Sequence, residues 1–264
     1  MSWLRAVYRA VALCLASAFW YLLWVPGKLL LAPKPAARLR WRQFILRHWA
    51  RALARSFGMR LTVRGTPPQP PFFLVANHLS YMDIVAFSSC LNCVFVSRHD
   101  LAHWPGIGLL ARSVGTIFLD RRRLQDIPRV IGLINQTLDE GSGIVLFPEG
   151  TSTKGDKVLP FSAALLEPAA QANYPVSYAA VTYRTPVGET PAHEAVCWWG
   201  DMDFVPHVWG LLQVKNFEGE ITFGDHTIQA SDRRTLAKGL WEAVNREFHP
   251  VVLPEAEPQA QLKQ

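Results

Sequence analysis

The chain has 264 residues and half of them are apolar, which allows one large domain or two small ones with a substantial core. Its formal net charge of +6 is unevenly distributed, because the first 82 residues contain twelve Lys and Arg and no Asp or Glu. Four cysteines exclude a disulfide framework in a chain of this size. Without a second cysteine pair beside Cys90 and Cys93 they predict no zinc site, and they favour a reduced compartment.

The basic N-terminal segment predicts contact with an anionic surface. Five of the ten tryptophans lie in the first 49 residues among basic and apolar residues: Trp3, Trp20, Trp24, Trp41 and Trp49. Amphipathic aromatic rings beside Lys and Arg are typical of a lipid interface. We therefore expect anionic membrane lipids, and no nucleic acid, as the partner of this segment.

Two helices are predicted in the N-terminal segment, residues 1–58. Residues 10–25 are uncharged, but this run is short of the roughly 20 residues that a straight crossing of the bilayer needs. Residues 36–58 have apolar side chains at helical spacing with arginines between them, which indicates a basic amphipathic helix lying in the interface. We expect a two-helix hairpin that docks into one leaflet, with a single transmembrane helix as the alternative.

Residues 59–249 alternate between short apolar strands and helices, which predicts an α/β domain with a mostly parallel sheet flanked by helices. The predicted strands are 59–64, 72–76, 93–97, 116–120, 143–147, 174–183, 195–199 and 219–224. The predicted helices are 80–91, 100–113, 122–140, 160–172 and 231–248. Residues 250–264 form a polar tail with three prolines, which we expect to be disordered.

Three polar segments follow predicted strands, where open α/β sheets place their functional sites: residues 77–83, 115–123 and 147–153. In the first, His78 can accept a proton from a hydroxyl near neutral pH, and a carboxylate such as Asp83 can fix its tautomer. Five residues of continuous helix would turn these two side chains to different faces. The pair therefore requires His78 in a loop and Asp83 in the helix that follows.

The other two segments add groups that can bind an anion. Arg121 offers a bidentate clamp at a strand end, and Glu149 lies in a turn with Gly150 and Thr151 that exposes backbone N–H groups. The sequence has no nucleophile elbow, no H-E-x-x-H motif and no glycine-rich nucleotide loop. These residues favour direct attack by a substrate hydroxyl, with His78 as the base.

Four blocks in this order resemble the glycerolipid acyltransferase family, which includes the bacterial 1-acylglycerol-3-phosphate acyltransferases. The blocks are Asn77-His78-x4-Asp83, Gly115-x-x-Phe118-x-x-Arg121, Phe147-Pro148-Glu149-Gly150-Thr151 and Tyr174-Pro175-Val176. The match covers approximately residues 59–220. The basic two-helix segment before it resembles the membrane-docking N-terminus of bacterial members.

The resemblance implies a membrane-associated O-acyltransferase that moves a fatty acyl group from acyl-CoA or acyl-ACP to a lysolipid hydroxyl, with no bound cofactor or metal. The implied acceptor is 1-acylglycerol-3-phosphate, giving phosphatidic acid in phospholipid biosynthesis. His78 would be the general base and Asp83 its orienting partner. The implied substrate-binding residues are Asn77, Arg121, Glu149, Gly150, Thr151 and Lys154. The implied location is the cytoplasmic face of the bacterial inner membrane, monotopic or single-pass.

The sequence also departs from the phosphatidate-forming members. Ser152 stands where those members usually have an arginine, although Lys154 or Lys157 could compensate. Residues 158–169 resemble the corresponding region of lyso-ornithine lipid acyltransferases, so a lyso-ornithine lipid is the alternative acceptor. Two other classes stay open: a non-catalytic membrane-binding module, and a hydrolase in which His78 activates water.

Overall fold

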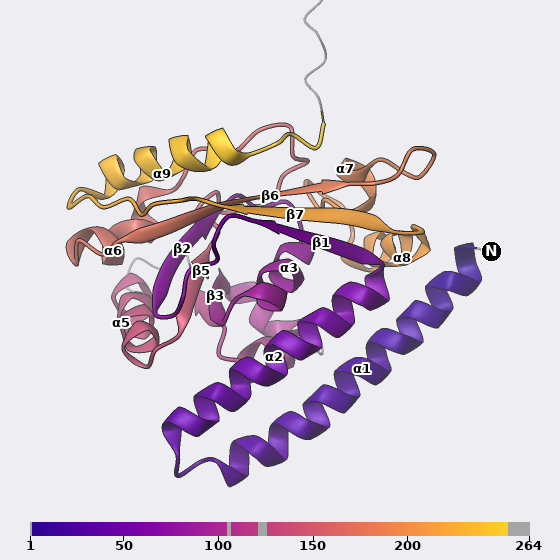
Figure 1. Cartoon of the computed structure of the whole chain (residues 1–264), viewed down its shortest axis with the longest axis horizontal. Coiled ribbons are helices and arrows are strands. Elements are labelled where there is room, and N and C mark those ends of the chain that lie inside the picture. The colour runs from indigo at the N-terminus through magenta and orange to yellow at the C-terminus, as the bar shows by residue number, and fades with distance from the viewer. Residues whose placement is uncertain (1, 105–106, 121–125, 253–264) are drawn as a thin grey trace, which may run out of the picture.

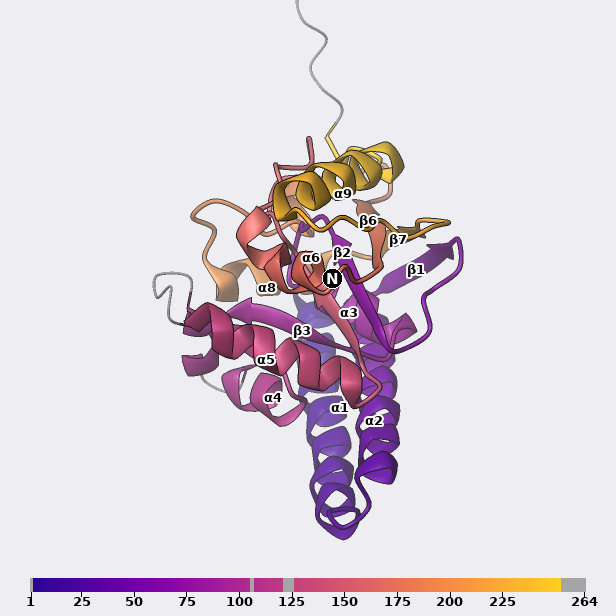
Figure 2. The same cartoon turned by 90° about the vertical axis from the view of Figure 1, so that its left-hand side faces the viewer.

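The computed structural model describes residues 2–104, 107–120 and 126–252, which form a helical hairpin attached to an α/β body (Figure 1). The hairpin consists of α1 (Ser2–Leu30) and α2 (Pro35–Phe57), which lie side by side and project from the body (Figure 2). α2 begins with a proline, which has no N–H to leave unpaired, and ends at Gly58 with a left-handed φ of 80°. The predicted two-helix N-terminal segment is present.

Among the described residues, α1 is the helix long and apolar enough to cross a membrane, judged by length and composition alone. Its large apolar side chains are mostly exposed, including Trp3, Leu4, Tyr8, Val11, Leu15, Phe19, Leu22, Leu29 and Leu30. Contiguous exposed apolar surface of this kind marks a contact with a membrane or a partner. The hairpin therefore has the surface that membrane association requires.

Some of the arginines of α2 contact the α/β body. Three of them donate hydrogen bonds to the α/β body, in the pairs Arg42–Ser142 and Arg47–Asn92 at 2.8 Å and Arg51–Ser89 at 3.0 Å. Arg38 and Arg55 are exposed. Part of the positive charge thus attaches the hairpin to the body, because each of the three guanidinium groups donates to an oxygen of the body.

The body is built on a seven-stranded sheet in the order β1-β7-β6-β2-β5-β3-β4. All neighbouring strands are parallel except β6 and β7, which are antiparallel. The strands are β1 (Met59–Arg64), β2 (Phe72–Ala76), β3 (Cys93–Arg98), β4 (Ile117–Leu119), β5 (Gly143–Leu146), β6 (Val176–Arg184) and β7 (Phe217–Phe223). The predicted mostly parallel α/β fold is confirmed.

Helices cover both faces of this sheet, with α9 above β6 and β7 and α3 with the hairpin below them in Figure 1. The helices of the body are α3 (Met82–Cys90), η1 (His99–His103), α4 (Ile107–Ser113), α5 (Asp126–Asp139), η2 (Ala163–Leu166), α6 (Glu167–Gln171), α7 (Ala192–Ala195), α8 (Phe204–Gln213) and α9 (Arg233–Glu247). Central strand β2 has only buried residues, as expected for a parallel strand covered on both faces.

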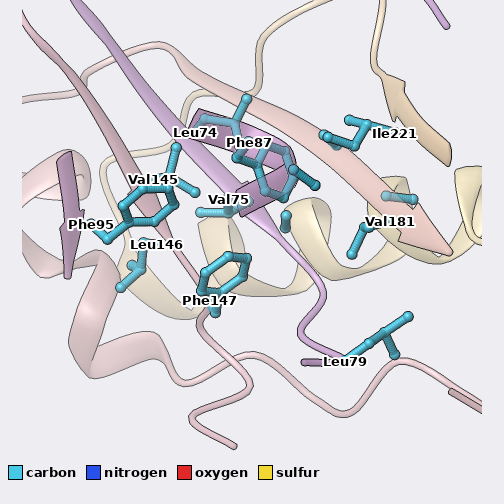
Figure 3. Packing of buried hydrophobic residues seen from close by; sticks show 14 of the residues in the cluster. Leu74, Val75, Leu79, Phe87, Phe95, Val145, Leu146, Phe147, Val181 and Ile221 are labelled. Atoms are coloured by element: carbon cyan, nitrogen blue, oxygen red, sulfur yellow. The ribbon is translucent and has the colours of Figure 1, made fainter. Parts of the chain in front are cut away.

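The core lies between the sheet and these helices. Figure 3 shows Phe87 of α3 packed near Val75 of β2, with Phe147 and Phe95 beside Leu146 at the end of β5. Phe87 and Val75 are 0% exposed. Each such side chain contributes about 1.5–3 kcal/mol by leaving water, so this packing fixes the strand ends from which the polar loops emerge.

One predicted strand is wrong. Residues 195–199 form the end of α7 and a turn, in which the Cys197 backbone N–H donates to Ala192 O at 3.0 Å. Its apolar composition predicts a strand, but Val196 and Cys197 are fully buried outside the sheet. Helix α8, which follows it, was not predicted.

Other predicted elements differ less from the structure. The predicted helix 100–113 is divided into η1 and α4, and the predicted helix 160–172 into η2 and α6. At the start of the predicted tail, the Val251 N–H donates to Gly155 O at 2.7 Å, so the chain still contacts the body there. Residues 253–264 lie outside the described residues.

Candidate active site

Two polar loops and one turn meet at the carboxyl ends of β2 and β5. The loop after β2 contains His78, and the loop after β5 contains Thr153, whose N–H donates to His78 O at 3.0 Å. The turn after α7 joins them, because the Trp198 N–H donates to Leu79 O at 2.8 Å. Ser152 Oγ in turn donates to Trp198 O. Trp198 therefore links the two loops through hydrogen bonds of its backbone, and the sequence around it does not predict this role.

His78 and Asp83 are in direct contact, with 2.6 Å between His78 Nδ1 and Asp83 Oδ2. His78 lies in the loop and Asp83 in the first turn of α3, which is the corner that their spacing required. A carboxylate accepts, so Nδ1 carries the proton in this pair and Nε2 is left as the acceptor of the ring. The His78 side chain is 23% exposed and that of Asp83 is 0% exposed, so of the two only the imidazole reaches solvent.

The Asp83 carboxylate is held by three further donors. Oδ2 also accepts from the N–H groups of Leu79 at 2.7 Å and Ser80 at 3.1 Å, while Oδ1 accepts from the Tyr183 hydroxyl at 2.8 Å. Burial, followed by the charge of Asp83, raises the pKa of Tyr183 well above its usual value, so the hydroxyl keeps its proton and donates. Tyr183 lies on β6, 100 residues from Asp83, and the sequence did not single it out.

The imidazole of His78 stacks on the buried ring of Phe147, with 4.4 Å between ring centroids and 13° between planes. Phe147 packs in turn on Phe95 and Phe87. The His–Asp contact fixes one edge of the imidazole and the stacking fixes its face. The ring orientation is therefore set from two sides before any substrate binds.

Glu149 connects the two loops instead of facing outward. Its Oε1 accepts from the His78 backbone N–H at 2.7 Å and its Oε2 from Leu159 N–H at 2.8 Å. Burial raises the pKa of Glu149 to about 8, although the two backbone donors oppose this shift. Both oxygens of the carboxyl thus accept from the main chain, at His78 and at Leu159.

The remaining predicted residues of the first and third blocks have varied surroundings. The amide of Asn77 donates to Val181 O at 2.9 Å and accepts from Val181 N–H at 2.8 Å, so it joins the ends of β2 and β6. Gly150 has a φ of 84° in the turn, and Thr151 is exposed. Lys154 Nζ lies 3.5 Å from Asp156 Oδ2, and both side chains are partly exposed.

The second block is described only in part. Gly115 has a φ of 90°, a conformation that favours glycine, and Phe118 O accepts from Arg129 at 2.7 Å. Arg121, the predicted anion clamp, lies outside the described residues.

An apolar cavity of about 200 Å³ lies between α5 and the strands that lead to these loops. Its lining includes Val96, Leu119, Val130, Ile134, Leu146 and Leu165. Leu146, the last residue of β5, is part of this lining and directly precedes Phe147, on which the His78 ring stacks. In the described part of the chain, no group of three or more His, Cys, Asp or Glu side chains could hold a metal ion.

Comparison with known proteins places this geometry in a family. The Acyltransferase family model matches residues 60–182. The lyso-ornithine lipid O-acyltransferase of Rhizobium meliloti is 33% identical over 199 residues, covering 71% of this chain and 68% of that protein. The 1-acyl-sn-glycerol-3-phosphate acyltransferase of Neisseria gonorrhoeae is 29% identical over 69% of this chain and 71% of its own length.

The fold has a solved counterpart. The crystal structure of the 1-acyl-sn-glycerophosphate (LPA) acyltransferase PlsC from Thermotoga maritima superposes with a TM-score of 0.61 over 94% of this chain and 98% of that one. The two share 16% sequence identity, so this likeness speaks for the fold. Together the matches confirm the acyltransferase resemblance predicted from the four sequence blocks.

Proposed function

The chain belongs to the acyltransferase family, and we propose that it transfers a fatty acyl group from an acyl thioester to the free hydroxyl of a lysolipid. The observation that carries this proposal is the His78–Asp83 pair, 2.6 Å apart, with the base partly exposed and the carboxylate buried. A neutral imidazole fixed in this way can take a proton from a hydroxyl at neutral pH.

The geometry supports a direct transfer. The acceptor hydroxyl attacks the thioester carbonyl while His78 Nε2 takes its proton, and Asp83 stabilises the imidazolium that forms. A carbon–oxygen bond forms, the carbon–sulfur bond breaks, and the imidazolium returns the proton to the leaving thiolate. The product is an ester and a free thiol. The reaction uses no resident cofactor, and the donor is a co-substrate, acyl-CoA or acyl-ACP.

The apolar cavity beside β5 fits the acyl chain of the donor. Its wall is formed by aliphatic side chains such as Val96, Ile134 and Leu146, which offer contacts to a hydrocarbon chain. Leu146 lies at the end of β5, the strand whose following loop contacts His78, and we propose that a chain bound in the cavity extends its thioester end toward that loop.

For the acceptor, we favour a lyso-ornithine lipid over 1-acylglycerol-3-phosphate. A phosphate needs cationic or N–H donors, yet at the third block Ser152 donates to Trp198 O and Lys154 pairs with Asp156. Arg121 stays a proposed anion ligand, and it is the residue on which 1-acylglycerol-3-phosphate as acceptor would depend. The Rhizobium meliloti relative, a lyso-ornithine lipid O-acyltransferase, supports the same choice.

We further propose that the enzyme is monotopic on the cytoplasmic face of the inner membrane. Arg5 donates to Gln213 O at 2.8 Å, and Arg9 to Val214 O at 2.6 Å, so the start of α1 is fastened to the body. α2 ends at Gly58, where β1 of the same body begins. A hairpin with both outer ends on the body enters and leaves the bilayer from one side, close to a lysolipid acceptor.

The proposal is tested by incubating purified protein and phospholipid vesicles with radiolabelled acyl-CoA or acyl-ACP. The acceptors are a lyso-ornithine lipid and 1-acylglycerol-3-phosphate, offered separately and together. We expect labelled ester that forms faster on the lyso-ornithine lipid. His78→Ala should lose about 10²–10⁴-fold in rate, while His249→Ala, an exposed histidine, should keep the wild-type rate.

Three outcomes would contradict parts of this account. Equal ester from wild type and His78→Ala would remove the assignment of the base. Faster acylation of 1-acylglycerol-3-phosphate would return phosphatidic acid as the product. Label found only as free fatty acid would indicate a hydrolase.

A further inference from the structure

Tyr183 holds the far oxygen of the catalytic carboxylate. Its hydroxyl donates to Asp83 Oδ1 at 2.8 Å, and its side chain is 1% exposed on β6. Room for the ring comes from β7, where Gly219 pairs with Tyr183 and a Cβ at position 219 would lie 3.1 Å from the ring. Phe217 closes the same space with its ring edge-on to Tyr183. The Tyr183 ring therefore fits the space that Gly219 leaves open and Phe217 closes, and this fixes where its hydroxyl lies.

The donors around Asp83 divide into two kinds. The N–H groups of Leu79 and Ser80 reach Oδ2 from the loop that also carries His78, so they move with the base. The Tyr183 hydroxyl reaches Oδ1 from the sheet and is a side-chain group that substitution can remove. It is thus the one donor to this carboxylate, among the described residues, that links it to the sheet.

Within residues 2–104, 107–120 and 126–252, the other ionisable groups found to interact with Asp83 or Tyr183 are not cations. They are Glu149, Cys197 and Tyr81. Burial raises the pKa of each, and for the Cys197 thiol and the Tyr81 hydroxyl this keeps the group neutral. In the part of the chain that the structure describes, the hydrogen-bond partners of the Asp83 carboxylate are therefore His78 and the three donors.

We propose that Tyr183 is a positioning residue that sets the base strength of His78 through Asp83, an inference that rests on His78 being the base of the proposed acyl transfer. A donor to a carboxylate draws part of its negative charge, which leaves less to stabilise an imidazolium on the other side. Removing the Tyr183 hydroxyl therefore leaves more of the carboxylate's negative charge to stabilise an imidazolium on His78.

The test compares two tyrosines on one strand. Tyr183→Phe removes the hydroxyl and keeps the ring. Tyr178→Phe is the matched control, because Tyr178 is equally buried on β6, points to the opposite face by strand alternation, and its hydroxyl faces His226 Nδ1 at 3.4 Å. Two readouts are used: NMR titration of the His78 ring nitrogens, assigned with His78→Ala, and the pH profile of kcat/KM with labelled acyl-CoA.

We expect the titration midpoint of His78 and the acid limb of kcat/KM to move upward together in Tyr183→Phe, by about half to one pH unit. Below the limb this is a loss of about 3- to 10-fold that recovers at higher pH. Tyr178→Phe should leave both where they are. A merely structural tyrosine would lower activity at all pH values without moving the midpoint.

The proposal is overturned if the His78 midpoint in Tyr183→Phe stays at the wild-type value or moves downward, or if both tyrosine variants move it equally. The NMR readout decides this even if the wild type transfers no acyl group. In that case the proposed function fails, and the coupling between Tyr183 and His78 is still measured.

Discussion

The loop after β2 and the loop after β5 both place a histidine or carboxylate at the same edge of the sheet, yet they use these groups differently. The first turns the His78 ring toward solvent, backed by a fully buried Asp83. The second turns Glu149 inward, where both of its oxygens accept backbone N–H groups. The first loop thus carries the group that we propose reacts, and the second holds the main chain of that group in place.

The contrast between His78 and Glu149 shows that a polar residue at a strand end is not by itself a substrate ligand. Asn77 is a further case, since both ends of its amide bind the backbone of Val181. A buried polar side chain that satisfies two main-chain groups fixes the local backbone, because leaving either group unpaired costs about 1–3 kcal/mol. Substitutions at Asp83, Glu149 and Lys154 should separate residues that react from residues that hold the backbone.

Asp83→Asn tests the reacting loop. The amide cannot stabilise an imidazolium and favours the wrong tautomer of His78, so we expect kcat to fall by about three to four orders of magnitude. The measurement is the initial rate of ester formation beside thermal unfolding by circular dichroism. Asp225→Asn, at a side chain 91% exposed, is the matched control and should behave as wild type. A rate for Asp83→Asn within tenfold of wild type would break the pair.

Glu149→Ala tests the holding loop. It leaves the N–H groups of His78 and Leu159 without their acceptor, so we expect a loss of about 1–3 kcal/mol in unfolding free energy. Displacement of the base should lower kcat by up to about a hundredfold while the acceptor KM stays nearly constant. The exposed Glu194→Ala is the control. A large rise in the acceptor KM at constant kcat would make Glu149 a substrate ligand.

Lys154→Ala tests the edge of the third block. Its ion pair with Asp156 is partly exposed, and such pairs contribute about 0–1 kcal/mol. We expect the KM for a lyso-ornithine lipid to change by less than about threefold. Measuring the KM for 1-acylglycerol-3-phosphate in the same assay sharpens the result. A tenfold rise for either acceptor would place Lys154 in the binding site.

The sheet was largely predictable because its central strands have a clear local sequence pattern. β2 and β5 are continuous apolar segments followed by polar turns, and the corner between His78 and Asp83 follows from their spacing. Residues 195–199 have the same apolar composition and are not a strand. The first three of these residues are buried at the end of α7 by tertiary packing, a cause that composition does not reveal.

What the sequence missed depends on contacts between distant residues. Tyr183 lies 100 positions from Asp83, and an alternating apolar strand gives no reason to single out one tyrosine. Arg42 and Arg47 have the spacing of an interfacial helix, but their partners Ser142 and Asn92 lie in the body. Only the folded chain shows which charges face lipid and which face protein.

The central claim is that His78 deprotonates the acceptor hydroxyl, and thiol release tests it most directly. Acyl-CoA is mixed with wild type or His78→Ala, with and without lyso-ornithine lipid in vesicles, and free thiol is followed with a chromogenic reagent. We predict rapid release only from wild type and only when the acceptor is present. Equal release without the acceptor, or from His78→Ala with it, would contradict the account.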